Sequence, residues 1–108
     1  MEIKITLMKF VIITAIKEFE KEIKQILKKS GVNTYSYRNV TGYRDSTQDS
    51  LETNWFATEM NENESIMFYA LTNEDSTDKI YSLINEFNKA EKTLTHIHMA
   101  ILQTEKTI

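Results

Sequence analysis

Residues 9–15, "KFVIITA", are a short β-branched apolar run, which predicts a buried strand. The period of the pattern then changes. Apolar side chains recur at helical spacing, with lysines and glutamates between them, at Ile16, Phe19, Ile23, Ile26 and Leu27. Ser30 and Gly31 follow, and the glycine stands where helices commonly end in a left-handed residue. The first part of the chain therefore predicts a strand followed by an amphipathic helix.

Three further strands and a second helix are predicted downstream. Residues 32–40 alternate Tyr35 and Tyr37 with polar residues, which is typical of a strand. Residues 64–72, "ESIMFYALT", form another continuous apolar run, and residues 94–102, "LTHIHMAIL", form the last one. Between these two runs the spacing predicts a helix with core positions Ile80, Leu83, Ile84 and Phe87, which Asp75 or Ser76 caps.

The resulting order, β-α-β-β-α-β, is the split βαβ arrangement of the ferredoxin-like sandwich, an α+β fold. A long polar loop separates its second and third strands. The 108 residues suit one domain spanning residues 1–108. Residues 1–7 precede the first strand and are interpreted as an N-terminal extension.

The two central strands are apolar on both sides. Phe10 and Ile12 alternate with Val11 and Ile13 in the first. In the third strand, Ile66, Phe68 and Ala70 alternate with Met67, Tyr69 and Leu71. Two helices can cover only one face of a four-stranded sheet, and an open face should carry polar residues. The pattern therefore predicts that another subunit covers the second face.

Composition narrows the class of function. A formal charge of -3 gives no excess of basic residues over phosphates, so nucleic acid is not the expected partner, although a local basic patch is compatible with it. Because the chain has no cysteine, it has neither a thiolate nucleophile nor a thiolate metal ligand. No nucleophile elbow or phosphate loop occurs, and we expect no enzyme. The longest apolar run, residues 10–16, is too short to cross a bilayer, and no signal-peptide cleavage site follows it; we expect a cytoplasmic protein.

Three features of the chain together resemble the PII signal-transduction superfamily. They are "MKFVIITAI" at residues 8–16, "VTGYRD" at residues 40–45, and the long loop before the third strand. In PII proteins the second strand ends in a Gly-aromatic-Gly turn; Gly42 and Tyr43 match its first two positions, and Arg44 replaces the second glycine. The resemblance implies a homotrimer that binds a small ligand in clefts between subunits. It also implies that residues 43–56, the counterpart of the T-loop, contact a partner, for which a membrane transporter is one candidate.

The chain also departs from the PII pattern. The family binds ATP through a glycine- and lysine-rich turn before the last strand, whereas residues 88–93, "NKAEKT", contain Lys89 and Lys92 but no glycine. The family's C-terminal arginine pair has no counterpart in "QTEKTI", and residues 44–54 contain no tyrosine to be uridylylated. ATP binding of the PII kind is therefore not expected, and the effector stays unknown.

Each candidate ligand-binding residue has a plain structural alternative. Trp55 and Phe56 either anchor the loop against a neighbouring subunit or stack on a ligand ring. Arg44 either pairs with a nearby aspartate at the surface or clamps an anion. Lys89 and Lys92 either form a solvated turn or hold phosphate.

His96 and His98 are candidate metal ligands, because residues two apart on a strand point to the same face. Two ligands do not close a site, so a subunit interface would have to supply others. The opposite residues, Ile97, Met99 and Ile101, form the better core face. The histidine pair favours an alternative function, a divalent-metal-binding tolerance protein of the CutA kind.

Overall fold

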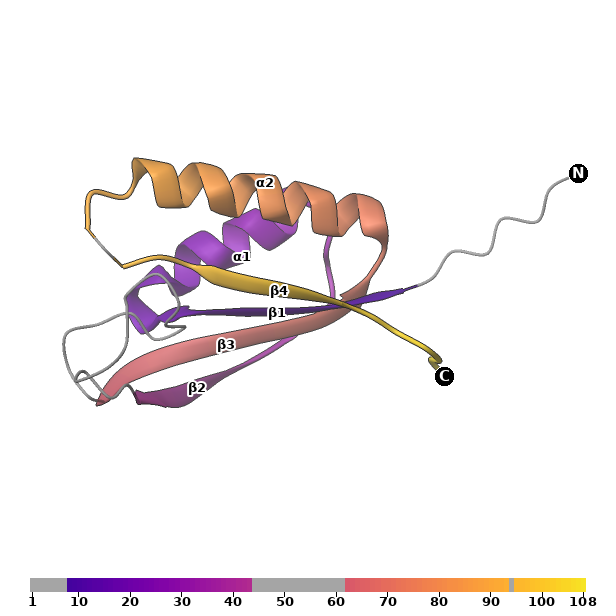
Figure 1. Cartoon of the computed structure of the whole chain (residues 1–108), viewed down its shortest axis with the longest axis horizontal. Coiled ribbons are helices and arrows are strands. Elements are labelled where there is room, and N and C mark those ends of the chain that lie inside the picture. The colour runs from indigo at the N-terminus through magenta and orange to yellow at the C-terminus, as the bar shows by residue number, and fades with distance from the viewer. Residues whose placement is uncertain (1–7, 44–61, 94) are drawn as a thin grey trace, which may run out of the picture.

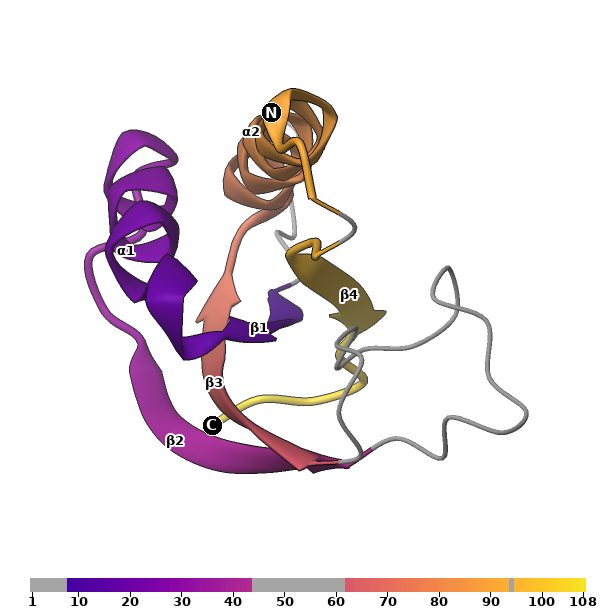
Figure 2. The same ribbon diagram turned by 90° about the vertical axis from the view of Figure 1, so that its left-hand side faces the viewer.

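The computed structural model describes residues 8–43, 62–93 and 95–108. Its elements follow the predicted β-α-β-β-α-β order (Figure 1). They are β1 (Lys9–Ile16), a short 3-10 turn η1 (Lys17–Phe19), α1 (Glu20–Lys29), β2 (Ser36–Tyr43), β3 (Glu62–Thr72), α2 (Glu74–Ala90) and β4 (His98–Gln103). The strands form one antiparallel sheet in the order β2-β3-β1-β4, and both helices lie on one side of it (Figure 2). The ferredoxin-like α+β prediction is confirmed.

Every second residue of the central strands is buried between the sheet and the helices. Val11 and Ile13 of β1 are each 1% exposed, and Ile66 and Phe68 of β3 are 0% and 1% exposed. The helices contribute Ile23, Ile26, Leu27, Ile80 and Ile84 to this core, and Leu83 and Phe87 pack against it. These positions are the ones that the 3.6-residue period of the sequence predicts.

The end of α1 follows the predicted glycine signal. Gly31 has φ +82°, and its backbone N–H donates to Lys28 O at 3.1 Å, while Val32 N–H donates to Leu27 O at 3.0 Å. This pair of hydrogen bonds is a Schellman motif, which satisfies two carbonyls at the end of the helix. The start of the helix differs from the prediction. Ile16 belongs to β1 and pairs with Ser65, so the chain needs the turn η1 before α1 begins at Glu20.

The cap of α2 was predicted wrongly. Asn73, and not Asp75 or Ser76, occupies the N-cap position, and its side-chain oxygen accepts the Ser76 N–H at 2.8 Å. Asp75 and Ser76 instead lie inside the first turn. An acidic first turn of Glu74 and Asp75 also suits the positive end of the helix dipole.

Strands β2 and β4 begin later than the sequence pattern predicted, because backbone groups just before them form other hydrogen bonds. Val32 closes α1 and its side chain is buried, so β2 begins only at Ser36, and it extends to Tyr43 because it keeps pairing with β3. The backbone groups of Ile97 bond to the side chain of Asn88, so β4 begins at His98 rather than at residue 94.

The register confirms that the sheet is apolar on both sides. Facing away from the helices are the residues of what we call the uncovered face: Phe10, Ile12, Met67, Tyr69, Leu71, Ala100 and Leu102. Leu71 and Leu102 are 48% and 46% exposed, and the rings of Phe10 and Tyr69 lie 6.2 Å apart. Ile101 pairs with Val11 and so lies on the helix side of the sheet, as predicted, but it is 41% exposed because β4 is an edge strand.

Candidate functional site

Most of the residues that the sequence singled out lie at one end of the sheet. The antiparallel pairing brings together the carboxyl ends of β1 and β2 and the amino ends of β3 and β4. The turn from α2 to β4 lies at the same end (Figure 1). We call this end the loop end, because the predicted T-loop leaves β2 there.

Gly42 and Tyr43 are the last residues of β2 and pair with Asn63 and Glu62 of β3. Gly42 is buried, whereas Tyr43 is 62% exposed, which leaves its ring free to meet a ligand or another chain. The structure thus places both residues at the base of the predicted loop. Arg44, Trp55 and Phe56 lie outside the described residues.

A polar hollow of about 200 Å³, which was not predicted from the sequence, lies along the end of β2 next to Gly42. Lys17, Asn39, Thr41 and Glu64 line it, together with Val40. They combine a cation, a carboxylate, an amide and a hydroxyl, which can bind a small polar molecule that both donates and accepts hydrogen bonds. The available signal was the helix-facing row of β2, which changes from aromatic Tyr37 to polar Asn39 and Thr41. Lys17 and Glu64 can be assigned to the hollow only from the register in which β1 and β3 pair, and the sequence does not show that register.

The α2–β4 turn is held by the side chain of Asn88. Its amide nitrogen donates to Ile97 O at 2.9 Å, and its oxygen accepts the Ile97 N–H at 2.9 Å. One side chain therefore satisfies both backbone groups of a residue that is 2% exposed. Asn88 is a structural member of the "NKAEKT" turn, while Lys89 and Lys92 are exposed on it and remain available to an anion.

His96 and His98 flank Ile97 and are both half-buried. His98 pairs with Thr14 on the side of the sheet away from the helices, as the sequence predicted. Burial, and then the neighbouring charge of His96, lower the pKa of His98. Within residues 8–43, 62–93 and 95–108, no group of three or more His, Cys, Asp or Glu side chains could hold a metal ion. The two histidines therefore do not make a closed metal site with other described residues of the same chain.

The candidate residues form two groups on opposite edges of the sheet. Gly42 and Tyr43 lie on the edge strand β2, whereas His98 lies on the other edge strand, β4, next to the turn that carries Lys92. Three interstrand spacings separate the edges, about 14 Å. A small ligand cannot easily touch both groups in one chain, but a neighbouring copy could bring one edge against the other.

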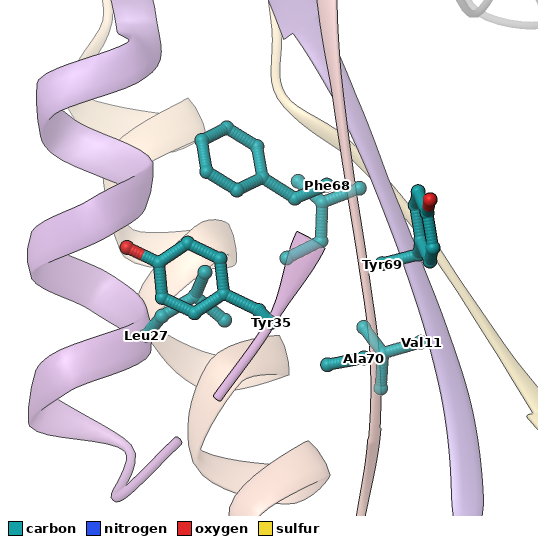
Figure 3. A pocket seen from close by; sticks show the side chains of 7 residues that line it. Val11, Leu27, Tyr35, Phe68, Tyr69 and Ala70 are labelled. Atoms are coloured by element: carbon teal, nitrogen blue, oxygen red, sulfur yellow. The ribbon is translucent and has the colours of Figure 1, made fainter. Parts of the chain in front are cut away.

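The hollow between α1 and the sheet is packed core rather than a ligand site. Val11, Leu27, Tyr35, Phe68 and Ala70 surround it, and it has no room for a water molecule. Figure 3 shows Phe68 and Tyr69 on opposite sides of β3, with Phe68 turned toward α1.

None of the helices in the described ranges is long and apolar enough to span a membrane.

Comparisons with known proteins identify the fold. No family model and no curated protein matches the chain. Solved structures match nearly all of it. A DUF3240 family protein from Shewanella baltica has a TM-score of 0.64 at 10% identity, covering 95% of this chain and 96% of that chain. CPII from Thiomonas intermedia, a nitrogen regulatory PII-like protein bound to ADP, AMP and bicarbonate, has a TM-score of 0.60 at 16% identity, covering 94% and 96%.

The GlnK–ATP complex of B. subtilis matches with a TM-score of 0.60 at 19% identity, covering 94% of this chain and 87% of that chain. The chain has the PII-like fold. The resemblance in the sequence is confirmed at this level. The loop end of the PII-like fold therefore carries Gly42, Tyr43, the α2–β4 turn and the polar hollow.

Proposed function

We propose that this PII-like chain is a regulatory binding protein that assembles as a homotrimer. It binds a small ligand in clefts between subunits and signals through residues 43–56 to a partner protein, for which a membrane transporter is the candidate that the resemblance offers. The proposal also makes it a cytoplasmic binding protein rather than an enzyme.

The observation that carries the proposal is the uncovered face. It includes Phe10, Ile12, Tyr69, Leu71 and Leu102, an apolar surface of the kind that self-association buries. The division of the candidate site between the two sheet edges supports the same assembly, because a cleft between copies would join its halves. The number three comes from the PII resemblance.

The structural neighbours supply the probes for a ligand. CPII binds ADP, AMP and bicarbonate, and GlnK binds ATP, so these four are the first to test. The hollow lined by Lys17, Asn39, Thr41 and Glu64 is small, which favours bicarbonate or part of a nucleotide. ATP should bind weakly in the cleft between subunits, because the turn at residues 88–93 has no glycine to let backbone N–H groups cradle phosphates.

The CutA-like metal function is the less favoured alternative. His96 and His98 are only two ligands, and the neighbours described above are PII-like proteins. Calorimetric titration with divalent metals, run beside the four probes, tests it directly.

Light scattering on the wild type and on Leu71→Lys tests assembly and ligand binding together. The wild type should give about 38 kDa, three times 12.7 kDa, and should bind at least one probe. Leu71→Lys buries an unpaired ammonium in the assembled face, which costs several kcal/mol, and should give monomers that no longer bind the probe in an intersubunit cleft. Tyr81→Lys, at an exposed position of α2, is the matched control and should stay trimeric. A monomeric wild type at micromolar concentration, or full binding of bicarbonate by a monomeric Leu71→Lys, would contradict the proposal.

A further inference from the structure

A second hollow, of about 390 Å³, lies along α1 and the segment that leads from α1 to β2. Its volume lies within the range of small-molecule sites, roughly 300–1,000 Å³. The polar residues that line it are Lys21, Lys24, Gln25, Lys28, Asn33 and Tyr35, which we call the lysine groove. None of them belongs to the candidate site at the loop end, and Asn33 and Tyr35 precede β2 at the opposite end of the sheet.

The three lysines share one face of α1, because they stand at positions i, i+3 and i+7. Lys24 is fixed in place. Its Nζ donates to Glu20 Oε2 at 2.8 Å and to the Tyr37 hydroxyl at 3.2 Å, and it lies 4.4 Å from the centre of the Tyr37 ring. The hydrogen bond to Glu20, and then that to Tyr37, raise the pKa of Lys24, which stays charged.

Lys21 and Lys28 flank this fixed cation, and both are exposed. In the part of the chain that the structure describes, neither has a carboxylate within ion-pair distance, since the Lys24–Glu20 pair is the one salt bridge found there. None of the described residues that line the groove is acidic. The formal charge of the chain is -3, so the groove is a local concentration of positive charge on an acidic protein, which attracts anions.

The number and spacing of the charges in the groove favour a chain of linked phosphates. Lysine ammonium groups bind phosphate as point charges, and three of them along one helix face suit an anion whose charges are spread along its length. The amides of Gln25 and Asn33 and the hydroxyl of Tyr35 provide neutral donors for further oxygens. Lys21 and Lys28 are seven residues apart, about 10 Å along the helix axis, so their long side chains can converge on linked phosphates better than on one small anion.

We propose that the lysine groove binds an oligophosphate, either inorganic or as the phosphate chain of a nucleotide, at a site separate from the intersubunit cleft. Lys21 and Lys28 supply the principal contacts, and Lys24, held by Glu20 and Tyr37, positions the centre of the chain. The site needs only one copy of the chain, so it does not depend on the proposed assembly.

The test is titration of inorganic tripolyphosphate into the full chain, labelled with ¹⁵N and followed by NMR. The amide signals that move should cluster at residues 21–28 and 33–35. The double variant Lys21→Ala/Lys28→Ala should raise the Kd about a hundredfold, about tenfold for each lost charge-assisted contact. Lys29→Ala/Lys79→Ala is the charge-matched control, because these two lysines line a different hollow, and its Kd should stay within about twofold of the wild type.

Further arms identify the source of the phosphate and can overturn the proposal. If the phosphate chain alone is recognised, ATP and tripolyphosphate should move the same groove signals and lose affinity equally in the double variant. Citrate should bind more weakly than tripolyphosphate. Absence of binding, shifts confined to residues around Lys89 and Lys92, equal weakening in the control variant, or citrate binding as tightly as tripolyphosphate would each overturn it.

Discussion

The two faces of the sheet are built from alternate residues of the same strands, yet they have different surroundings. On the face under the helices, Ile13 and Phe68 are each 1% exposed. On the uncovered face, Tyr69 is half-buried and Leu71 is 48% exposed, although both stand within three residues of Phe68 in the same apolar strand. Apolar residues of one strand therefore do not contribute equally to the stability of one subunit. The first face stabilises the fold, whereas the second is available to stabilise an assembly.

The sharpest comparison truncates neighbouring aromatic residues on opposite faces. Phe68→Ala should lower the free energy of unfolding by about 3–5 kcal/mol at every protein concentration, because it leaves a cavity beside Tyr35 and Tyr37, whose rings lie 5.6 and 5.1 Å away. Tyr69→Ala should cost less in the separate subunit. If the proposed assembly forms, the cost of Tyr69→Ala should grow with protein concentration, because association stabilises the folded state by mass action.

Urea denaturation over a wide range of protein concentrations measures both variants. A loss for Tyr69→Ala that equals the loss for Phe68→Ala at the lowest concentration would show that the uncovered face is already covered within one subunit.

A smaller effect is expected at Asn88, whose side chain holds the backbone of Ile97 just before β4 begins. Asn88→Ala removes both partners of the Ile97 backbone and should cost about 1–3 kcal/mol. Asn85→Ala, at an exposed position of the same helix, is the control and should change the free energy of unfolding by less than about 0.5 kcal/mol. Equal losses in the two variants would mean that the hydrogen-bond pair does not cause the effect, and helix propensity would not explain them either, because alanine favours a helix more than asparagine does.

The smallest effect concerns the titration of His98 on the uncovered side. Burial lowers its pKa below the ordinary value of 6.5, so below about pH 6.5 the unfolded chain binds more protons than the folded chain. The free energy of unfolding should therefore fall as the pH drops from about 6.5 toward the lowered pKa, and it should be unaffected by this group above that range. His98→Gln should remove this part of the pH dependence. Denaturation curves between pH 5 and pH 8, values that bracket the ordinary histidine pKa, measure the difference. A pH profile that His98→Gln leaves unchanged would assign the effect to other groups.

Features that depend on one segment at a time could be predicted from the sequence. The strand at β1, the periodic core faces of both helices and the left-handed Gly31 were predicted because apolar spacing and glycine conformation are local properties. The two-faced apolar pattern of β1 and β3 was also local, since alternate residues of any strand point to opposite sides. Even here the N-cap of α2 was predicted wrongly, because Asn73, Asp75 and Ser76 all suit that position and lie close together.

Which distant residues share a site could not be predicted, because it depends on how strands pair and helices pack. Lys17 and Glu64 meet in one hollow because β1 and β3 pair in a particular register, and no spacing along the chain encodes that meeting. Likewise, Tyr35 joins the lysines of α1 only because the chain turns back after Gly31. The edge positions of β2 and β4, which separate Tyr43 from His98, follow from the strand order. Local patterns set which elements form, but strand pairing and helix packing fix their neighbours, and a binding site is a property of neighbours.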